Sequence, residues 1–166
     1  MFYDQYTEEL HELLLSLDKQ WGVDAYPAGI DWDEWEKRIL QVKACLEEIL
    51  GIALELYEMQ DSYSTLSIVK YKEVNRGNSG SYYATVFEIG FSNYGNLALT
   101  GLSYPGATYS IEQMSAIKHC LGKEGFIGVD AAVLDIAYDG EFAYFKVSSH
   151  DGVTQEAWHN RFLGME

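Results

Sequence analysis

The stretch Tyr82–Phe91, with the sequence YYATVFEIGF, is the strongest strand signal in the chain. Its alternate apolar side chains would share one face of a strand, and they are Tyr83, Phe87, Ile89 and Phe91. Residues 65–74, rich in Thr, Ile, Val and Tyr, precede it across one turn, and residues 97–102 follow it across another. Strands joined by short turns are typical of an antiparallel meander, so the middle of the chain predicts a sheet.

Two amphipathic helices are predicted before this sheet. Residues 6–19 carry apolar residues at spacings of three and four, and Asp31 with Glu34 has the spacing of a capping box that starts a second helix. The apolar stripe of the second helix is formed by Trp35, Ile39, Val42, Leu46 and Ile49. Residues 52–60 fit both a helix and a strand. We favour a helix that continues to about Tyr57, because Ala, Leu, Glu and Met are good helix formers.

A third helix and further strands are predicted after the sheet. Ser110 and Gln113 form a capping box, and the inner stripe of the helix they start is formed by Ile111, Met114, Ile117 and Leu121. The Asp-Gly pair at 139–140 predicts a hairpin with Leu134, Ile136 and Tyr138 on one arm, and residues 154–163 predict a short closing helix. This order predicts one α+β domain over residues 1–166, with two N-terminal helices packed on a mainly antiparallel sheet and a further helix inserted between strands.

The chain is strongly acidic, yet its composition is that of a folded protein. Asp and Glu total 26 against 11 Lys and Arg, which gives a formal net charge of −15, while 48% of the residues are apolar and 14% are aromatic. A disordered acidic tail would be poor in aromatics, so we expect the acids on the surface of a packed body. Such a surface repels nucleic acid and anionic membranes and attracts basic proteins.

No motif for catalysis, nucleotide binding or metal binding stands out. The sequence lacks G-x-G-x-x-G, Walker A and G-x-S-x-G motifs. No two of its four histidines have the i, i+4 spacing of a helical metal site. We therefore expect no enzyme activity, no cofactor and no metal. Cys45 and Cys120 lie among apolar residues of predicted helices, where we favour buried free thiols over the alternative of a disulfide between them.

The start of the chain lacks the basic and apolar regions of a signal peptide, and no apolar run is long enough to cross a bilayer. These features lead us to expect a cytoplasmic protein. Together with the acidic surface, they predict a protein partner with a basic surface, and no direct binding to nucleic acid or membrane.

Two acidic patches that contain aromatic residues are the candidate partner-binding sites. One lies at the start of the second predicted helix, and the other lies on the predicted hairpin. Aromatic side chains among acids suit an interface, although a large side chain such as that of Trp32 is more often buried in a core. The first patch comprises Asp31, Trp32, Asp33, Glu34 and Glu36, and the second comprises Tyr138, Asp139 and Glu141.

Three short motifs in the C-terminal half resemble the immunity proteins of bacterial polymorphic-toxin and contact-dependent inhibition systems. They are Phe91-Ser92-Asn93-Tyr94-Gly95-Asn96-Leu97, Tyr138-Asp139-Gly140, and Trp158 with Arg161-Phe162. The resemblance implies a cytoplasmic inhibitor that binds one cognate toxin, and many such toxins are nucleases with basic clefts. An acidic inhibitor suits this task, because electrostatic steering speeds its approach and its carboxylates can replace phosphate in the cleft.

Two other functions remain open on the sequence. A small-ligand enzyme with an unrecognised site would draw on the tyrosines, histidines and carboxylates of the second half, and it requires a concave pocket with convergent polar groups. An assembly module of a phage or of a secretion machinery would instead self-associate or bind a non-toxic partner.

Overall fold

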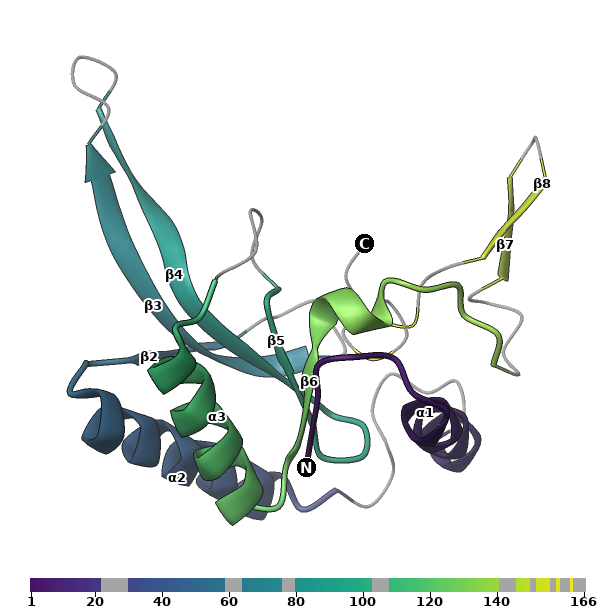
Figure 1. Ribbon diagram of the computed structural model, residues 1–166, viewed down its shortest axis with the longest axis horizontal. Helices are drawn as coiled ribbons and strands as arrows, with labels where there is room; N and C mark the ends of the chain where they lie inside the picture. The colour runs from purple at the N-terminus through teal and green to yellow at the C-terminus, as the bar shows by residue number, and fades with distance from the viewer. Residues whose placement is uncertain are drawn as a thin grey trace.

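The centre of the molecule is a six-stranded sheet with the strand order β1-β6-β5-β4-β3-β2 (Figure 1). The computed structural model describes residues 1–21, 30–58, 64–75, 80–102, 108–140, 146–149, 152–155, 158 and 162. The strands of the sheet are β1 (Phe2–Tyr3), β2 (Glu55–Glu58), β3 (Ser64–Asn75), β4 (Ser81–Ser92), β5 (Leu97–Thr100) and β6 (Ile127–Asp130). Strands β3 to β5 form the predicted antiparallel meander, β2 adds a further antiparallel strand beside β3, and β6 runs parallel to both β5 and β1.

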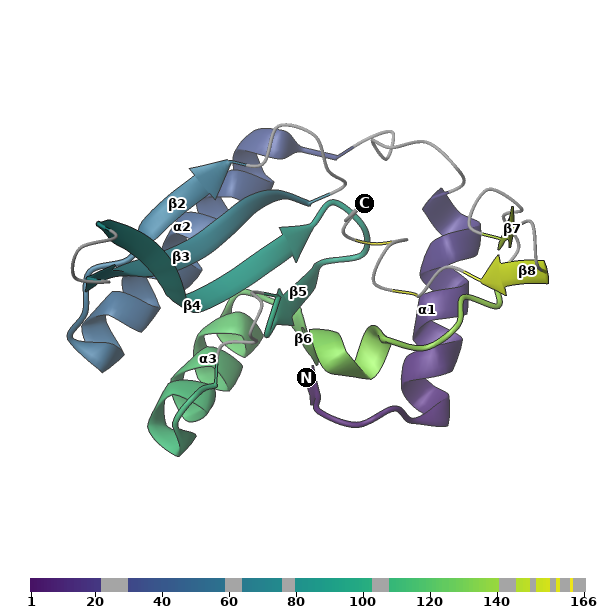
Figure 2. The same ribbon diagram turned by 90° about the horizontal axis from the view of Figure 1, so that it is seen from above.

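Within the described part of the chain, three helices pack against this sheet, and the predicted α+β class is confirmed (Figure 2). They are α1 (Glu8–Trp21), α2 (Trp32–Leu50) and α3 (Ile111–Lys123), the last of which is inserted between β5 and β6 as predicted. The side chains of α2 and α3 pack with Ala98 in one buried cluster, whereas those of α1 pack with Leu97 and Leu99 in another. Because neighbouring residues of a strand point to opposite faces, the two clusters lie on opposite sides of β5.

The predicted helix starts are observed, since capping is a local interaction. The Asp31 carboxylate accepts a hydrogen bond from the Glu34 N–H, although the side chain of Glu34 turns to Lys37 instead of completing the box. Both halves of the capping box are formed at Ser110 and Gln113. Helix α1 starts two residues later than predicted, after the Thr7 hydroxyl, which accepts a hydrogen bond from the Leu10 N–H.

The prediction that α2 continues to about Tyr57 is wrong. The helix ends at Gly51, which is left-handed at φ 62° and donates its N–H to the Glu47 carbonyl. The Glu47 carboxylate then accepts the Leu54 N–H at 2.9 Å and the Lys43 ammonium at 2.8 Å. These contacts satisfy backbone groups at the turn, and the chain leaves the helix to form β2 against β3.

We expect Glu47→Gln to lower the free energy of unfolding at neutral pH by about 1 kcal/mol. The Lys43 hydrogen bond and then the Leu54 N–H hold the pKa of the Glu47 carboxyl below its ordinary value. A lowered folded-state pKa stabilises the protein above the ordinary pKa, and this contribution disappears as pH falls. Urea unfolding at neutral pH and at about pH 3 should therefore show a difference from the parent that shrinks in acid. Equal losses at both pH values, or an equal loss in the exposed neighbour control Glu48→Gln, would contradict this account.

Three residues of the predicted inner faces are exposed instead. Ile49 is 51% exposed. At this end of α2, Leu50 takes the position that packs on the core. Ile111 is 91% exposed, since the first residue of α3 lies about 120° around the helix from buried Ile117. Tyr83 is 71% exposed. Lys70 pairs with Phe87 and Tyr71 with Thr85, so an irregularity at Val86 interrupts the alternation that would have aligned Tyr83 with the core.

The predicted hairpin around Asp139-Gly140 is also wrong in its first arm. Leu134 ends a short 3-10 helix, Ala131–Leu134, whose start is capped by the Asp130 carboxylate, and Tyr138 lies in no regular strand. The C-terminal hairpin is formed later, by β7 (Lys146–Ser149) and β8 (Gly152–Gln155). Thr154 therefore belongs to a strand and not to the predicted closing helix. Within that predicted helix, Trp158 and Phe162 have helical backbone, and residues 156–157, 159–161 and 163 lie outside the described residues.

The expectation of free thiols is wrong as well. Cys45 of α2 and Cys120 of α3 form a disulfide, with their Cα atoms 5.8 Å apart. Both residues lie on the inner side of helices that pack side by side, a juxtaposition that only the tertiary fold creates. Among the described helices, none combines the length and the apolar character needed to span a membrane.

Candidate functional site

The start of α2 presents an exposed acidic surface, here called the acidic rim. Its members are Asp31, Asp33, Glu34 and Glu36, all exposed. Carboxylates in the first turn of a helix interact favourably with the positive end of the helix dipole, and this interaction accounts for part of the acidic composition of the helix start. Lys37 neutralises one of them, since its ammonium lies 2.9 Å from Glu34 Oε2. Among the described residues, neither Asp33 nor Glu36 forms an ion pair.

Trp32 lies among these acids and is 39% exposed. Its ring makes an edge-on contact with Trp35, with the ring centroids 5.7 Å apart. Trp35 is itself buried in the core beneath α2. The first predicted patch therefore combines exposed carboxylates with a large aromatic side chain that is supported from below, instead of burying that side chain as large aromatics usually are.

A pocket of about 270 Å³ opens beside the acidic rim. It lies between the start of α2 and the turn that joins β4 to β5. Asp31 and Glu34 bring negative charge to it, and Arg38 brings positive charge. The residues that line it are Ile30, Asp31, Glu34, Trp35, Arg38, Asn93, Gly95 and Asn96.

Arg38 fixes the wall of this pocket. Its Nε and Nη2 atoms donate to the Glu124 carbonyl at 2.9 and 2.6 Å, and Nη1 donates to Asn96 Oδ1 at 2.9 Å. The guanidinium also lies over the Phe126 ring, 4.5 Å from its centroid. One side chain thereby connects α2, the end of α3 and the β4–β5 turn, and it helps to hold the acidic rim in a fixed position relative to the sheet.

The second predicted patch is not an exposed surface of the same kind. Tyr138 is fully buried, and its hydroxyl donates to Asp18 Oδ2 at 2.6 Å, so it cannot contact a partner. A Cβ atom at Gly140 would meet both of these side chains, which explains a glycine there without a hairpin turn. Glu141 lies outside the described residues.

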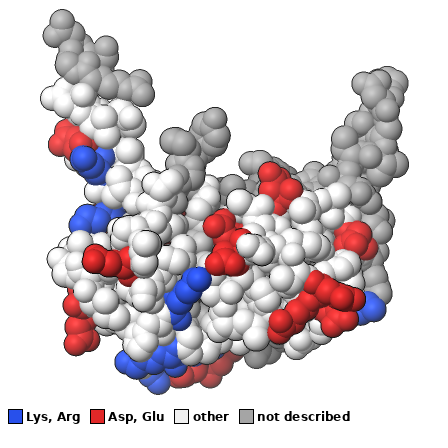
Figure 3. Space-filling view, in the orientation of Figure 1, with Lys and Arg blue, Asp and Glu red and all other residues white. Residues whose placement is uncertain are grey.

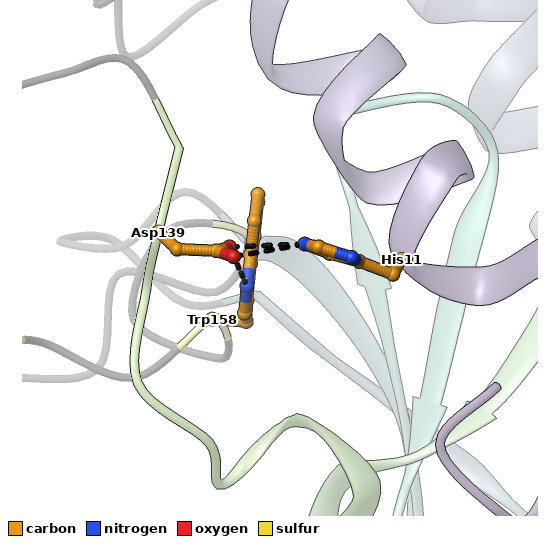
Figure 4. Close-up of polar contacts among 3 residues, drawn as sticks. All are labelled: His11, Asp139 and Trp158. Atoms are coloured by element: carbon orange, nitrogen blue, oxygen red, sulfur yellow. Dashed lines mark hydrogen bonds and ion pairs between the residues drawn. The ribbon is translucent and has the colours of Figure 1, made fainter. Parts of the chain in front are cut away.

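Asp139 is exposed but is bound within the molecule, as Figure 4 shows. Its carboxylate oxygens lie 3.0 and 3.1 Å from His11 Nε2, and Oδ1 also accepts the Trp158 Nε1–H at 3.2 Å. Partial burial, and then the charge of Asp139, raise the pKa of the nearby Tyr6 phenol. His11 and Asp139 are separated by 128 positions, so no local signal in the sequence could have predicted this cluster.

A carboxylate that orients an imidazole is also a component of hydrolytic sites. Neither His11 nor Asp139 lines the 270 Å³ pocket. Within the described part of the chain, no serine, threonine or cysteine is hydrogen-bonded to His11. The cluster instead ties the C-terminal segment to α1. Among the described residues, no group of three or more His, Cys, Asp or Glu side chains is placed to hold a metal ion.

The acidic rim is thus the predicted site that the structure leaves exposed on a rigid support. Comparisons of this chain with protein-family models, with curated proteins and with solved structures find no match.

Proposed function

We propose that this protein is an acidic, immunity-type inhibitor that binds a cognate toxin and blocks its active site. The observation that carries the proposal is the acidic rim together with Trp32: four exposed carboxylates lie within four residues of a tryptophan whose ring contacts buried Trp35. A nuclease is the kind of toxin that fits best, because its cleft is basic in order to hold phosphate.

The two parts of this surface would have different roles in such a complex. Exposed charges such as Asp33 and Glu36 mainly speed the encounter with a basic protein, and salt screens their effect. Selectivity requires a desolvated anchor, and aromatic residues are common in that role. Trp32 is suited to it, since its support by Trp35 limits the side-chain entropy lost on binding.

We propose a cytoplasmic location, which requires that the protein remain folded when Cys45 and Cys120 are reduced. Cytoplasmic thiols are kept reduced, so in that compartment Cys45 and Cys120 would be adjacent thiols and the fold would have to persist without the bridge. An oxidising compartment would preserve the disulfide. Labelling of thiols in freshly lysed cells distinguishes these states.

The function itself is tested by co-expression with the reading frames encoded beside this one. We expect one neighbour to be toxic alone, to be neutralised by this chain and to be recovered in a complex with it. The proposal fails if no neighbour is toxic, or if a toxic neighbour is neither bound nor neutralised.

The double variant Asp33→Lys, Glu36→Lys should slow association with the toxin by about tenfold or more at low salt, with a smaller effect on dissociation. The matched control is Glu8→Lys, Glu12→Lys, which makes the same change in net charge on exposed positions of α1. Surface plasmon resonance measures both rate constants. Equal slowing by the two variants would show that overall charge, and not the acidic rim, directs the encounter.

A small-ligand enzyme is the second candidate, and the 270 Å³ pocket with its two carboxylates and one guanidinium favours it. Its test is turnover of small metabolites by the purified chain. Turnover that is lost in Glu34→Gln, in a variant that remains folded, would establish this function in place of the first.

A further inference from the structure

Strands β3 and β4 extend beyond the rest of the sheet as a two-stranded ribbon (Figure 1). Each strand has twelve residues. Strand β2 covers β3 only over Leu66–Val69, and β5 covers β4 only over Ile89–Phe91. We call the remaining part, Lys70–Asn75 with Ser81–Phe87, the distal hairpin. Apart from their pairing with each other, its two segments pair with no described strand. Two-stranded hairpins without further packing are marginally stable in water.

In the distal hairpin, the outer edge of β4 lacks a charged residue, a proline and a neighbouring described strand, and the irregularity at Val86 is its one usual protection among the described residues. The segment Ser81–Phe87, with the sequence SYYATVF, has no charged residue and no proline. Tyr83 and Val86 within it are 71% and 38% exposed. Natural edge strands are commonly blocked by lysine, proline or a covering element. Uncharged β-forming segments of this length are those that add to another strand.

The body of the protein ends its own pairing with β4 at Glu88. There the Tyr109 hydroxyl donates to the Glu88 carbonyl and accepts the Glu88 N–H at 3.4 Å, and it also accepts the Gly101 N–H at 3.4 Å. The backbone groups of Glu88 therefore point to the outer edge of β4, where a side chain occupies the place of a strand. Beyond this residue, the edge from Tyr83 to Phe87 is the continuation on which a new strand would pair.

The local charge of this region favours a second copy of the chain as the partner of this edge. Residues 64–92 contain three basic residues, Lys70, Lys72 and Arg76, against two acidic ones, Glu73 and Glu88, in a chain of net charge −15. Figure 3 shows both signs on this ribbon, whereas acidic side chains gather over α1. Two identical molecules repel one another over most of their surfaces, and the repulsion is weakest where the local charge is near zero.

We propose that a second copy of this chain pairs with it, β4 against β4, to form a dimer in which the two sheets are continuous. An antiparallel pair of identical strands about a twofold axis places the same uncharged segment on both sides, as an isologous interface requires. The distal hairpin projects away from the layer of α2 and α3 (Figure 1). Dimerisation there leaves the acidic rim accessible, so it is independent of the proposed function.

Sedimentation velocity of the full chain over a range of concentrations tests the dimer. We expect a monomer–dimer equilibrium that shifts toward dimer as ionic strength rises from about 0.1 M to about 1 M, because the Debye length falls from about 10 Å to about 3 Å. Salt screens the repulsion between the two molecules and leaves the pairing of uncharged strands intact. A chain that stays monomeric at every concentration and salt level, or a dimer that dissociates as salt rises, overturns the proposal.

The double variant Tyr83→Lys, Val86→Lys should weaken the dimer by about tenfold or more, since lysine on an edge strand opposes pairing. Both side chains are exposed, and circular dichroism verifies that the fold is retained. The control is Ile49→Lys, Ile111→Lys, which places the same two charges at exposed apolar residues of α2 and α3. Unchanged dimerisation in the double variant, or equal weakening in the control, refutes pairing through β4.

Discussion

Replacing Trp158 with alanine is expected to lower the free energy of unfolding by about 3–5 kcal/mol. Trp158 is fully buried. Its ring stacks on Phe162 with an interplanar angle of 8°, and it lies 4.7 Å from the Tyr138 ring, centroid to centroid. Truncation would open a cavity between α1 and the C-terminal segment, and it would remove the donor that binds Asp139.

Chemical unfolding of the parent and the variant measures this loss. The control is Trp32→Ala, which deletes the same side chain from an exposed position and should cost about 1 kcal/mol or less. Trp158→Phe keeps most of the buried volume and loses the Nε1–H, so a loss of about 1 kcal/mol is expected for it. Similar losses for Trp158→Ala and Trp32→Ala would show that the C-terminal segment contributes little to the folded state.

Removal of the disulfide between Cys45 and Cys120 is expected to lower the free energy of unfolding by about 4 kcal/mol in the chain-entropy model for a loop of this length. The bridge closes a loop between residues 75 positions apart and joins the two helices on one face of the sheet. Such a loss is a large fraction of the stability of a typical domain. Cys45→Ala, Cys120→Ala is the suitable variant, because alanine leaves no polar atom at the buried Cys120 site.

Reduction of the native protein provides the matched measurement. Dithiothreitol should shift the unfolding transition of the parent to that of the double variant and should not affect the variant itself. Free thiols in the oxidised, purified protein, or a parent transition that does not respond to reduction, would contradict the prediction. A reduced protein that remains folded would also meet the condition for a cytoplasmic inhibitor.

Most secondary structure could be predicted because its signals are local. The caps at Asp31 and Ser110 depend on side chains three residues from the groups they bind. The strands of the meander follow from an alternation that any short window of sequence displays. The exposed carboxylates of the acidic rim could be predicted for the same reason, since acids at a helix start are rarely buried.

The errors occur where a distant contact competes with a local preference. Residues 52–57 contain good helix formers, yet the helix ends at Gly51, where the Glu47 carboxylate accepts the Leu54 N–H. The following residues form β2, which pairs with β3. Alternation in β4 fails at Val86, where the pairing with β3 is irregular. Tyr138 and Asp139 are neighbours in sequence and form one predicted patch, but the Tyr138 hydroxyl donates to Asp18 in the interior, whereas the Asp139 carboxylate lies against His11 at the surface.

The sequence by itself determined the fold class, the helix starts at Asp31 and Ser110, the antiparallel meander and the acidic composition, because each depends on composition or on residues within a few positions of one another. The tertiary structure decided the disulfide, the pocket beside the acidic rim, the exposure of Trp32 and the part of β4 that no described strand other than β3 covers. Each of these depends on contacts, or on missing strand neighbours, between segments far apart in the chain. Such relations carry no periodic signal and arise only when the elements pack.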